Sequence, residues 1–485
     1  MDHRNVGTGL PRSRLTDRTP APFAMPPFLP APLPRLVSSI ALLTGLACGQ
    51  ETSAPSPKPP PLGSAQIRLT PVVARPGEPF TLSLRVAGAQ GPTIIATPTD
   101  APGGAPRTML LQQSGRSVES LLLYDDGSHG DAQSGDGWYT TTGLTLPVGP
   151  TGIAVEMISS LTVGQPASPL DSIFLSLRIG FRAMDPARIP IPAVISLATN
   201  ARATSRVVSL AMPPVREPTQ ATLDVVLERY FELLPDDRDF LVVEFPPSAA
   251  TATDAWWAQS LVMRNNIPGI GLPIRQFRSF SSRARLQVAV LVAAMAYNTL
   301  GPPGGFCLLN HELAHRWMAY TNDRLSVSGH WIYDRVNRPT SVLGDSLGCL
   351  MNDLELYLAG FLPADSITTP LTSDGYALAD VIQVLGPRGY GPGEAERKFT
   401  IGFIVVDATT LADEELAFFH HVATEYVAAE SDLGRTWFVA TGGRSTLDGI
   451  LPTSLGVALA GRNSRASRTA PRPGRRLHAE PDRHR

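Results

Sequence analysis

Between Gln66 and about Pro186 the chain alternates apolar and polar residues in short runs, separated by clusters of Gly, Pro and Asp. A period of two is typical of half-buried strands, because successive side chains of a strand point to opposite faces. The runs with this pattern are Gln66–Val73, Phe80–Val86, Thr93–Ala96, Ser117–Tyr124, Gly137–Leu144, Gly152–Ile158 and Ser172–Ile179. Short strands at regular intervals predict an antiparallel β-sandwich over residues 66–186.

The pattern changes after about Ile189. Apolar residues in Thr222–Leu234 recur at helical spacing, and Phe240–Phe245 is a short apolar run that predicts a buried strand. Arg283–Asn298 is strongly apolar over a length that favours a helix over a strand. Further helices are expected over Gly305–Asn322, Asn352–Phe361 and Ala412–Glu430. This mixture predicts one α+β domain over residues 189–460.

Residues 1–48 have the features of an upstream extension followed by an export signal. Leu36–Ala47 is too short to span a bilayer and has the form of the apolar core of a signal peptide. Met25 would give a more compact signal than Met1. The residues Gly45-Leu46-Ala47-Cys48 resemble a bacterial lipobox, although Gly45 stands where leucine is preferred. We expect Cys48 to be lipidated; the alternative is an ordinary signal peptide with a chance cysteine.

Two segments flank the predicted domains. Residues 49–65 are rich in Pro and Ser and predict a semi-extended linker. Residues 461–485 contain many arginines and few apolar residues, which predicts a disordered tail, either merely solvated or attracted to an anionic surface. The net charge of −2 indicates no nucleic-acid partner. We predict a cell-envelope lipoprotein, of the outer membrane or cell surface and held to the membrane by its lipid anchor, or otherwise a secreted protein.

The segment His311-Glu312-Leu313-Ala314-His315 has the spacing of a zinc-peptidase motif. Residues i and i+4 of a helix lie on one face, so His311 and His315 can direct their imidazoles at one ion. Glu312 can take a proton from the bound water as general base. In metzincins, Gly and His would stand where this chain has Met318 and Thr321, so that class is excluded.

The third zinc ligand is left open among three residues. Glu355 is surrounded by apolar residues, and a buried carboxylate needs a partner, which a metal would supply. The alternative for Glu355 is a capping box with Asn352. His330 could bind zinc, stabilise an oxyanion or simply pack as a loop residue. Asp353 is the third candidate, although a helix-start charge explains it better.

Cys307 and Cys349 remain when Cys48 is lipidated. An exported protein can oxidise its cysteines, so these two predict a disulfide. Two buried free thiols are the alternative that the sequence leaves open.

The loop between Tyr124 and Tyr139 contains four Asp and four Gly. Carboxylate oxygens on a flexible loop are typical ligands of calcium, and Asp126, Asp131 and Asp136 are the candidate ligands of a Ca²⁺ ion. The spacing is not that of an EF-hand. The alternative is a turn in which Asp and Gly serve the backbone geometry alone.

The blocks HELAHRWMAY, GHW and NDLELYLAGFLP resemble those of uncharacterised bacterial zincin-like metallopeptidases of the gluzincin type. In those proteins an acidic residue aligns with Glu355. The later stretch FIVVDATTLADEELAFFHHVATEYVAAESDLGRTWFVATGGRSTLDG looks like their C-terminal part, and the loop LYDDGSHGDAQSGDGWYT is similar to one in Ig-like domains of exported bacterial proteins. The resemblance covers about residues 66–455. It implies an Ig-like sandwich followed by a zincin-like domain.

These features predict a zinc metallopeptidase, of the endopeptidase type, that acts on a protein or peptide substrate with Zn²⁺ and Glu312. The alternative is a catalytically inactive zincin-like protein that serves in surface binding or adhesion. A zinc hydrolase of non-peptide bonds is a third reading.

Overall fold

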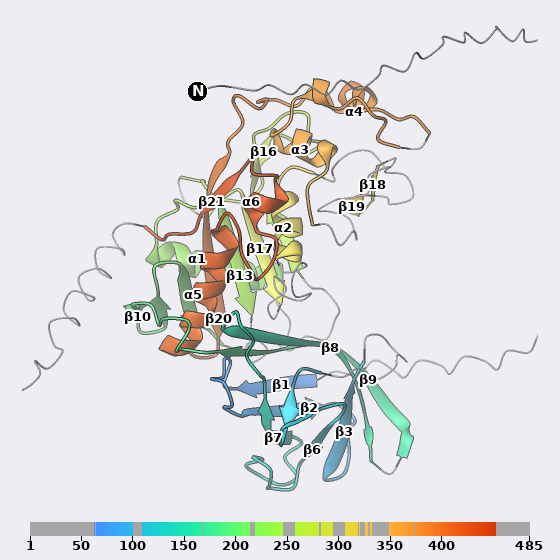
Figure 1. Cartoon of the computed structure of the whole chain (residues 1–485), viewed down its shortest axis with the longest axis vertical. Helices are drawn as coiled ribbons and strands as arrows, with labels where there is room; N and C mark the ends of the chain where they lie inside the picture. The colour runs from blue at the N-terminus through green and yellow to red at the C-terminus, as the bar shows by residue number, and fades with distance from the viewer. Residues whose placement is uncertain are drawn as a thin grey trace, which may run out of the picture. The chain divides into compact units, whose positions relative to one another are not determined.

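A computed structural model describes most of the two predicted domains (Figure 1). The described residues are 63, 65–99, 109–166, 168–213, 219–245, 258–280, 283–293, 306–318, 320, 325–327, 330–331, 349–372 and 374–452. The predicted signal, Cys48, most of the linker and the Arg-rich tail lie outside them. Among the described helices, none is both long and apolar enough to cross a membrane.

The first sheet is antiparallel and runs in the order β1-β2-β7-β6-β3-β8-β9. A small hairpin, β4 and β5, adds to β7. The strands are β1 (Ala65–Thr70), β2 (Phe80–Val86), β3 (Thr93–Pro98), β4 (Gln112–Gln113), β5 (Arg116–Ser117), β6 (Leu121–Tyr124), β7 (Tyr139–Thr145), β8 (Ile153–Gln165) and β9 (Ser168–Met184). Each predicted run therefore overlaps a strand, and the described residues of this region are all-β.

The predicted alternation appears directly in the burial of these strands. Side chains of β1 alternate strictly between buried and exposed, and the buried ones join a core with those of the other strands. Just after β1, Ala74 bridges to Ala183 of β9, the last strand of the path, so the two ends of the sheet approach each other. Hydrogen bonds join all the strands into one sheet, and the assignment to the Ig-like class stays a prediction.

The second sheet runs in the order β10-β11-β12-β20-β13-β17-β14, with β21 beside β20. Its strands are β10 (Ile195–Ala198), β11 (Ala201–Ala203), β12 (Val207–Ala211), β13 (Phe240–Phe245), β14 (Ala258–Val262), β17 (Val288–Ala293), β20 (Lys398–Asp407) and β21 (Thr446–Asp448). The strands β12, β20, β13 and β17 are parallel, whereas β14 pairs antiparallel to β17. The predicted α+β class did not specify this parallel pairing of the central strands.

Helices cover both faces of this second sheet. The helices are α1 (Gln220–Leu233), α2 (Cys307–Ala314), α3 (Asp353–Ala359), α4 (Leu378–Leu385), α5 (Asp413–Val427) and α6 (Trp437–Ala440). Alternate residues of β13 separate the faces: Leu241 and Val243 pack in one core with α1, and Val242 packs in the other with α2, α3 and α5. Two-sided burial explains why the central strands are mostly apolar.

The helix predicted over Arg283–Asn298 is wrong for the described part, which forms the strand β17. It pairs with β13 on one side and β14 on the other, from Val288 to Ala293. A strand buried on both faces shows no period of two, so its sequence cannot be distinguished from a buried helix. Residues 294–298 lie outside the described residues.

A buried ion pair connects strands of the two sheets. The guanidinium of Arg182 in β9 donates to the carboxylate of Glu244 in β13 at 2.7 Å. Both side chains are almost fully buried. The amide of Val72 also donates to Glu415 in α5 at 3.1 Å.

The first sheet ends at Met184 and the second begins at Ile195, on either side of the boundary predicted at residues 186–189.

His420 of α5 makes the fold sensitive to acid. Its Nδ1 lies 2.9 Å from the hydroxyl of Thr204, and burial, aided by Arg206 and His421, lowers its pKa to about 4. The pKa of His420 in the folded protein lies below its value in the unfolded chain. The stability that the neutral imidazole contributes is therefore present above pH 6.5 and is lost as the pH falls through about 4. The side chain of His420 is partly exposed, which reduces the effect, so the expected loss of unfolding free energy is about 2 kcal/mol.

The variant His420→Gln keeps a hydrogen-bonding group near Thr204 but cannot titrate. Urea unfolding at pH 7 and pH 4 should show a smaller loss of unfolding free energy in the variant, by about 2 kcal/mol. An equal loss in both proteins would show that protonation of His420 is not the cause.

Candidate metal centre

Helix α2 holds the HExxH motif and is shorter than predicted. The prediction extended over Gly305–Asn322, whereas the helix ends at Ala314 and the chain continues in turns. Amides of the next residues bond three positions back, Arg316 to Leu313 and Trp317 to Ala314, which tightens the last turn. Leu313 and Trp317 are buried and fix the helix on the sheet.

The two motif histidines face each other. Their Nε2 atoms lie 3.2 Å apart, and their rings are 82° from coplanar. Zinc–nitrogen bonds of about 2.0–2.1 Å at a tetrahedral angle place two ligand nitrogens about 3.3–3.4 Å apart. The hydroxyl of Tyr320 donates to the carbonyl of His315 at 2.6 Å and helps to fix this end of the motif. His311 and His315 therefore have the spacing of two ligands of one zinc ion.

Glu312 is buried between α2 and the edge strand β14. Its side chain is 6% exposed, and burial raises its pKa to about 8, against the smaller opposite effect of the backbone amide of Ser260. A carboxyl group with this pKa is suited to exchanging protons near neutral pH. Ser260, the residue of β14 that bonds Glu312, was not identified from the sequence, since no local motif marks an edge strand.

Glu355 forms a capping box at the start of α3. Its Oε2 accepts the amide of Asn352 at 2.9 Å, and the side chain of Asn352 accepts the amide of Glu355 at 3.0 Å. Glu355 is fully buried. Among the described residues, Glu355, His311 and His315 do not bring three ligand atoms within 4.8 Å of one another. This geometry matches the capping alternative, and zinc ligation by Glu355 stays a prediction.

The other two ligand candidates are in different surroundings. Asp353 is exposed in the first turn of α3, as expected of a helix-start charge. His330 lies in a two-residue strand, β19 (His330–Trp331), that pairs with β18 (Ser326–Val327). The side chain of His330 lies outside the described part of the chain, so its role stays a prediction.

A disulfide joins Cys307 and Cys349, the pair proposed from the sequence, with Cα atoms 5.2 Å apart. Cys307 is the first residue of α2, and Cys349 precedes α3 by a few residues. The bond therefore ties the helix with the motif histidines to the segment that leads to Glu355.

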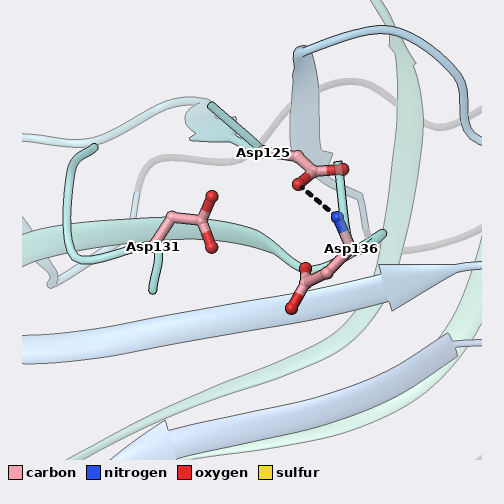
Figure 2. Close-up of side chains that lie close together, drawn as sticks. All are labelled: Asp125, Asp131 and Asp136. Carbon is pink, nitrogen blue, oxygen red and sulfur yellow. Dashed lines mark hydrogen bonds between the residues drawn. The ribbon is translucent and has the colours of Figure 1, made fainter. Parts of the chain in front are cut away.

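The acidic loop of the first sheet brings together Asp125, Asp131 and Asp136, whose oxygens lie within 4.8 Å of one another (Figure 2). Asp125 takes the place predicted for Asp126, which instead accepts the amide and hydroxyl of Ser128. The sequence contains a signal for this, because alternation along β6 places Leu121, Leu123 and Asp125 on the buried face.

Hydrogen bonds within the loop explain its aspartates without a metal. Asp125 accepts the amides of Gly135, Asp136 and Gly137, at 2.7, 3.2 and 3.0 Å. Asp131 accepts the amide of Gly127 at 2.8 Å. These contacts describe the turn alternative, and calcium binding stays a prediction.

Comparisons with known proteins assign no family. A scan against protein-family models and a search of curated proteins find no match to this chain.

Proposed function

We propose that the protein is an exported zinc metallopeptidase, lipid-anchored through Cys48, that hydrolyses peptide bonds with Glu312 as general base. The observation that supports it most is the 3.2 Å spacing of the two imidazole nitrogens of His311 and His315, beside a buried carboxyl group on the same helix. Two imidazoles whose nitrogens lie this close together are a typical arrangement of metal ligands.

In this proposal His311 and His315 hold the ion, and a third ligand completes the site. Bound zinc would polarise the scissile carbonyl and lower the pKa of a bound water. Glu312 accepts the proton of that water and passes it to the leaving amine. The amide of Ser260 orients the Glu312 carboxyl, whose pKa is raised by burial.

The position of β14 favours a peptide over an ester or a glycan. It is the last strand of the second sheet, and only β17 pairs with it among the described residues. An extended peptide can add to such an edge through main-chain hydrogen bonds. The edge strand lies beside Glu312, so a peptide bound there would pass close to the motif.

An inactive binding or adhesion protein is the second candidate. The observation that favours it is the capping box, in which the Glu355 carboxylate accepts the amide of Asn352. Under this reading the zincin-like region would be a scaffold, and Glu312 would have no catalytic role.

Zinc content separates the two candidates. The full-length protein should contain about one zinc ion per chain by elemental mass spectrometry, as a mononuclear site requires. His311→Ala and His315→Ala should each lose it, because two ligands hold zinc weakly. His129→Ala, on the exposed loop of the first sheet, is the matched control and should retain it. Wild-type protein without zinc, even after reconstitution, would leave only the binding reading.

The same measurement identifies the third ligand. Glu355→Gln retains the shape of the side chain, and His330→Ala and Asp353→Ala test the other candidates. One of these variants should lose zinc while its folded near-UV spectrum persists. Retention in all three would place the third ligand elsewhere in the chain.

A further inference from the structure

A cavity of about 190 Å³ lies near the N-terminal ends of β17 and β20, and its lining combines charged and apolar side chains. Arg264 of β15 (Arg264–Asn265) and Arg388 contribute guanidinium groups. Ile267, Trp317 and Phe399 contribute apolar surface. A cavity of about 150 Å³ accommodates a benzene-sized molecule, so this one has room for a small organic ligand.

Arg264 is the guanidinium with unused hydrogen-bonding capacity. Its Nε is buried and has no hydrogen-bond partner among the described residues. Among the residues that the structure describes, no carboxylate lies within ion-pair distance of Arg264. Several other arginines do form ion pairs. A buried donor without a partner is costly, so a bound acceptor would stabilise this arrangement.

Two further arginines lie at or near the cavity: Arg388 lines it, and Arg316 lies behind two of its lining amides. Arg316 is fully buried, and its guanidinium donates to neutral amide oxygens, Gln287 at 2.9 Å and Asn266 at 3.1 Å. Both of these amide residues line the cavity. Arg388 donates to the main-chain carbonyls of Leu358 and Ala359, at 2.7 and 2.9 Å.

Glu396 of the lining partly offsets this positive charge, since it interacts electrostatically with Arg264 and Arg316. Arg388 has no carboxylate at ion-pair distance among the described residues, and burial lowers its pKa to about 10. Buried cations without counter-ions are unfavourable, and an anion in the cavity would offset this cost.

Two acidic residues also line the cavity. Glu394 and Glu396 are exposed, and Glu396 accepts from Gln287 at 3.2 Å. Their position disfavours a multiply charged anion such as phosphate, because it would approach two carboxylates. The apolar walls favour a ligand in which a single negative charge is attached to an apolar group.

We propose that this cavity is a binding site for a small organic carboxylate, which the guanidinium of Arg264 holds by charge-assisted hydrogen bonds. The planar guanidinium matches a carboxylate in two parallel bonds. Trp317 and Phe399 contact the apolar part of the ligand. The site is separate from the proposed zinc chemistry and does not depend on it.

Calorimetric titration of the full-length protein tests this, with N-acetylphenylalanine as probe. The protein is treated with a chelator, because carboxylates also bind zinc. We expect saturable binding of N-acetylphenylalanine and at least about tenfold weaker binding of its carboxamide, as the loss of one charge-assisted contact predicts. Inorganic phosphate should bind more weakly than the carboxylate. Equal binding of the amide, tighter binding of phosphate, or no binding in the millimolar range would each overturn the proposal.

Substitutions assign the effect to the cavity. Arg264→Gln should weaken binding at least about tenfold, and Arg264→Lys should lose part of it, since lysine cannot make two parallel bonds. The matched control is Arg275→Gln, on the paired strand β16 (Arg275–Gln276), where the side chain is exposed. Equal effects of Arg264→Gln and Arg275→Gln would contradict a specific role for Arg264. Glu312→Gln should bind normally, so this test can fail or succeed independently of the peptidase.

Discussion

Glu312→Gln is expected to reduce peptide hydrolysis by about 10²- to 10⁴-fold, the usual contribution of a general base. Glutamine keeps the shape and burial of the side chain but cannot accept the proton of the attacking water. The two histidines are unchanged, so the zinc content should remain that of the wild type. Cleavage of casein or of a quenched fluorescent peptide, with zinc measured on the same sample, checks this.

Two comparisons separate catalysis from folding in that experiment. Glu228→Gln changes an exposed carboxyl group of α1 and should leave hydrolysis unchanged. Burial raises the pKa of Glu312, so the zinc-free fold favours the protonated carboxyl group. This contribution to stability is fully present below about pH 4.5 and is lost as the pH rises to about 8. Above pH 8, Glu312→Gln should therefore be at least as stable as the wild type. Full activity in this variant, with zinc bound, would exclude Glu312 as the base.

Opening the Cys307–Cys349 disulfide is expected to lower the free energy of unfolding by about 4 kcal/mol, from the entropy of the closed loop. The bond spans a sequence separation of 42 residues. Urea unfolding of the zinc-free Cys307→Ser variant checks this value. Zinc affinity should fall as well, because the bond holds α2 beside the segment that leads to α3.

The single and double cysteine variants provide the internal control. Either single substitution removes the same bond, so Cys307→Ser, Cys349→Ser and the double variant should have similar stability. Additive losses would show that the two side chains act through separate packing. A loss below about 1 kcal/mol would show that the loop is already restricted in the unfolded chain.

The strands of the first sheet follow from the sequence alone, because their period of two is a local property. Phe80–Val86 was predicted with the bounds it has, and the alternation in Gln66–Val73 marks the buried side chains of β1. The long pair β8 and β9 was only partly predicted. Their outer parts are held by pairing with each other, from Ile153↔Met184 onward, which no local pattern records.

The candidate metal site also combines features that follow from the local sequence with features that depend on tertiary contacts. The spacing of His311 and His315 determines that both lie on one helical face, since the helical turn is the same in any context. Glu355 was predicted as a zinc ligand, with a helix cap as the alternative that the sequence also supports. Only the arrangement of α3 relative to α2 distinguishes them, and the capping box is the geometry observed.

The sequence by itself therefore determined the local features: alternating strands, the amphipathic helix α1, the HExxH spacing and the two cysteines available for pairing. Tertiary structure decided which segments meet. It made Val288–Ala293 an interior strand of the sheet, placed Ser260 beside Glu312, and brought Arg264 and Arg388 to one cavity. These residues are distant in the chain, so their contacts depend on the packing of the whole sheet and leave no periodic signal in the sequence.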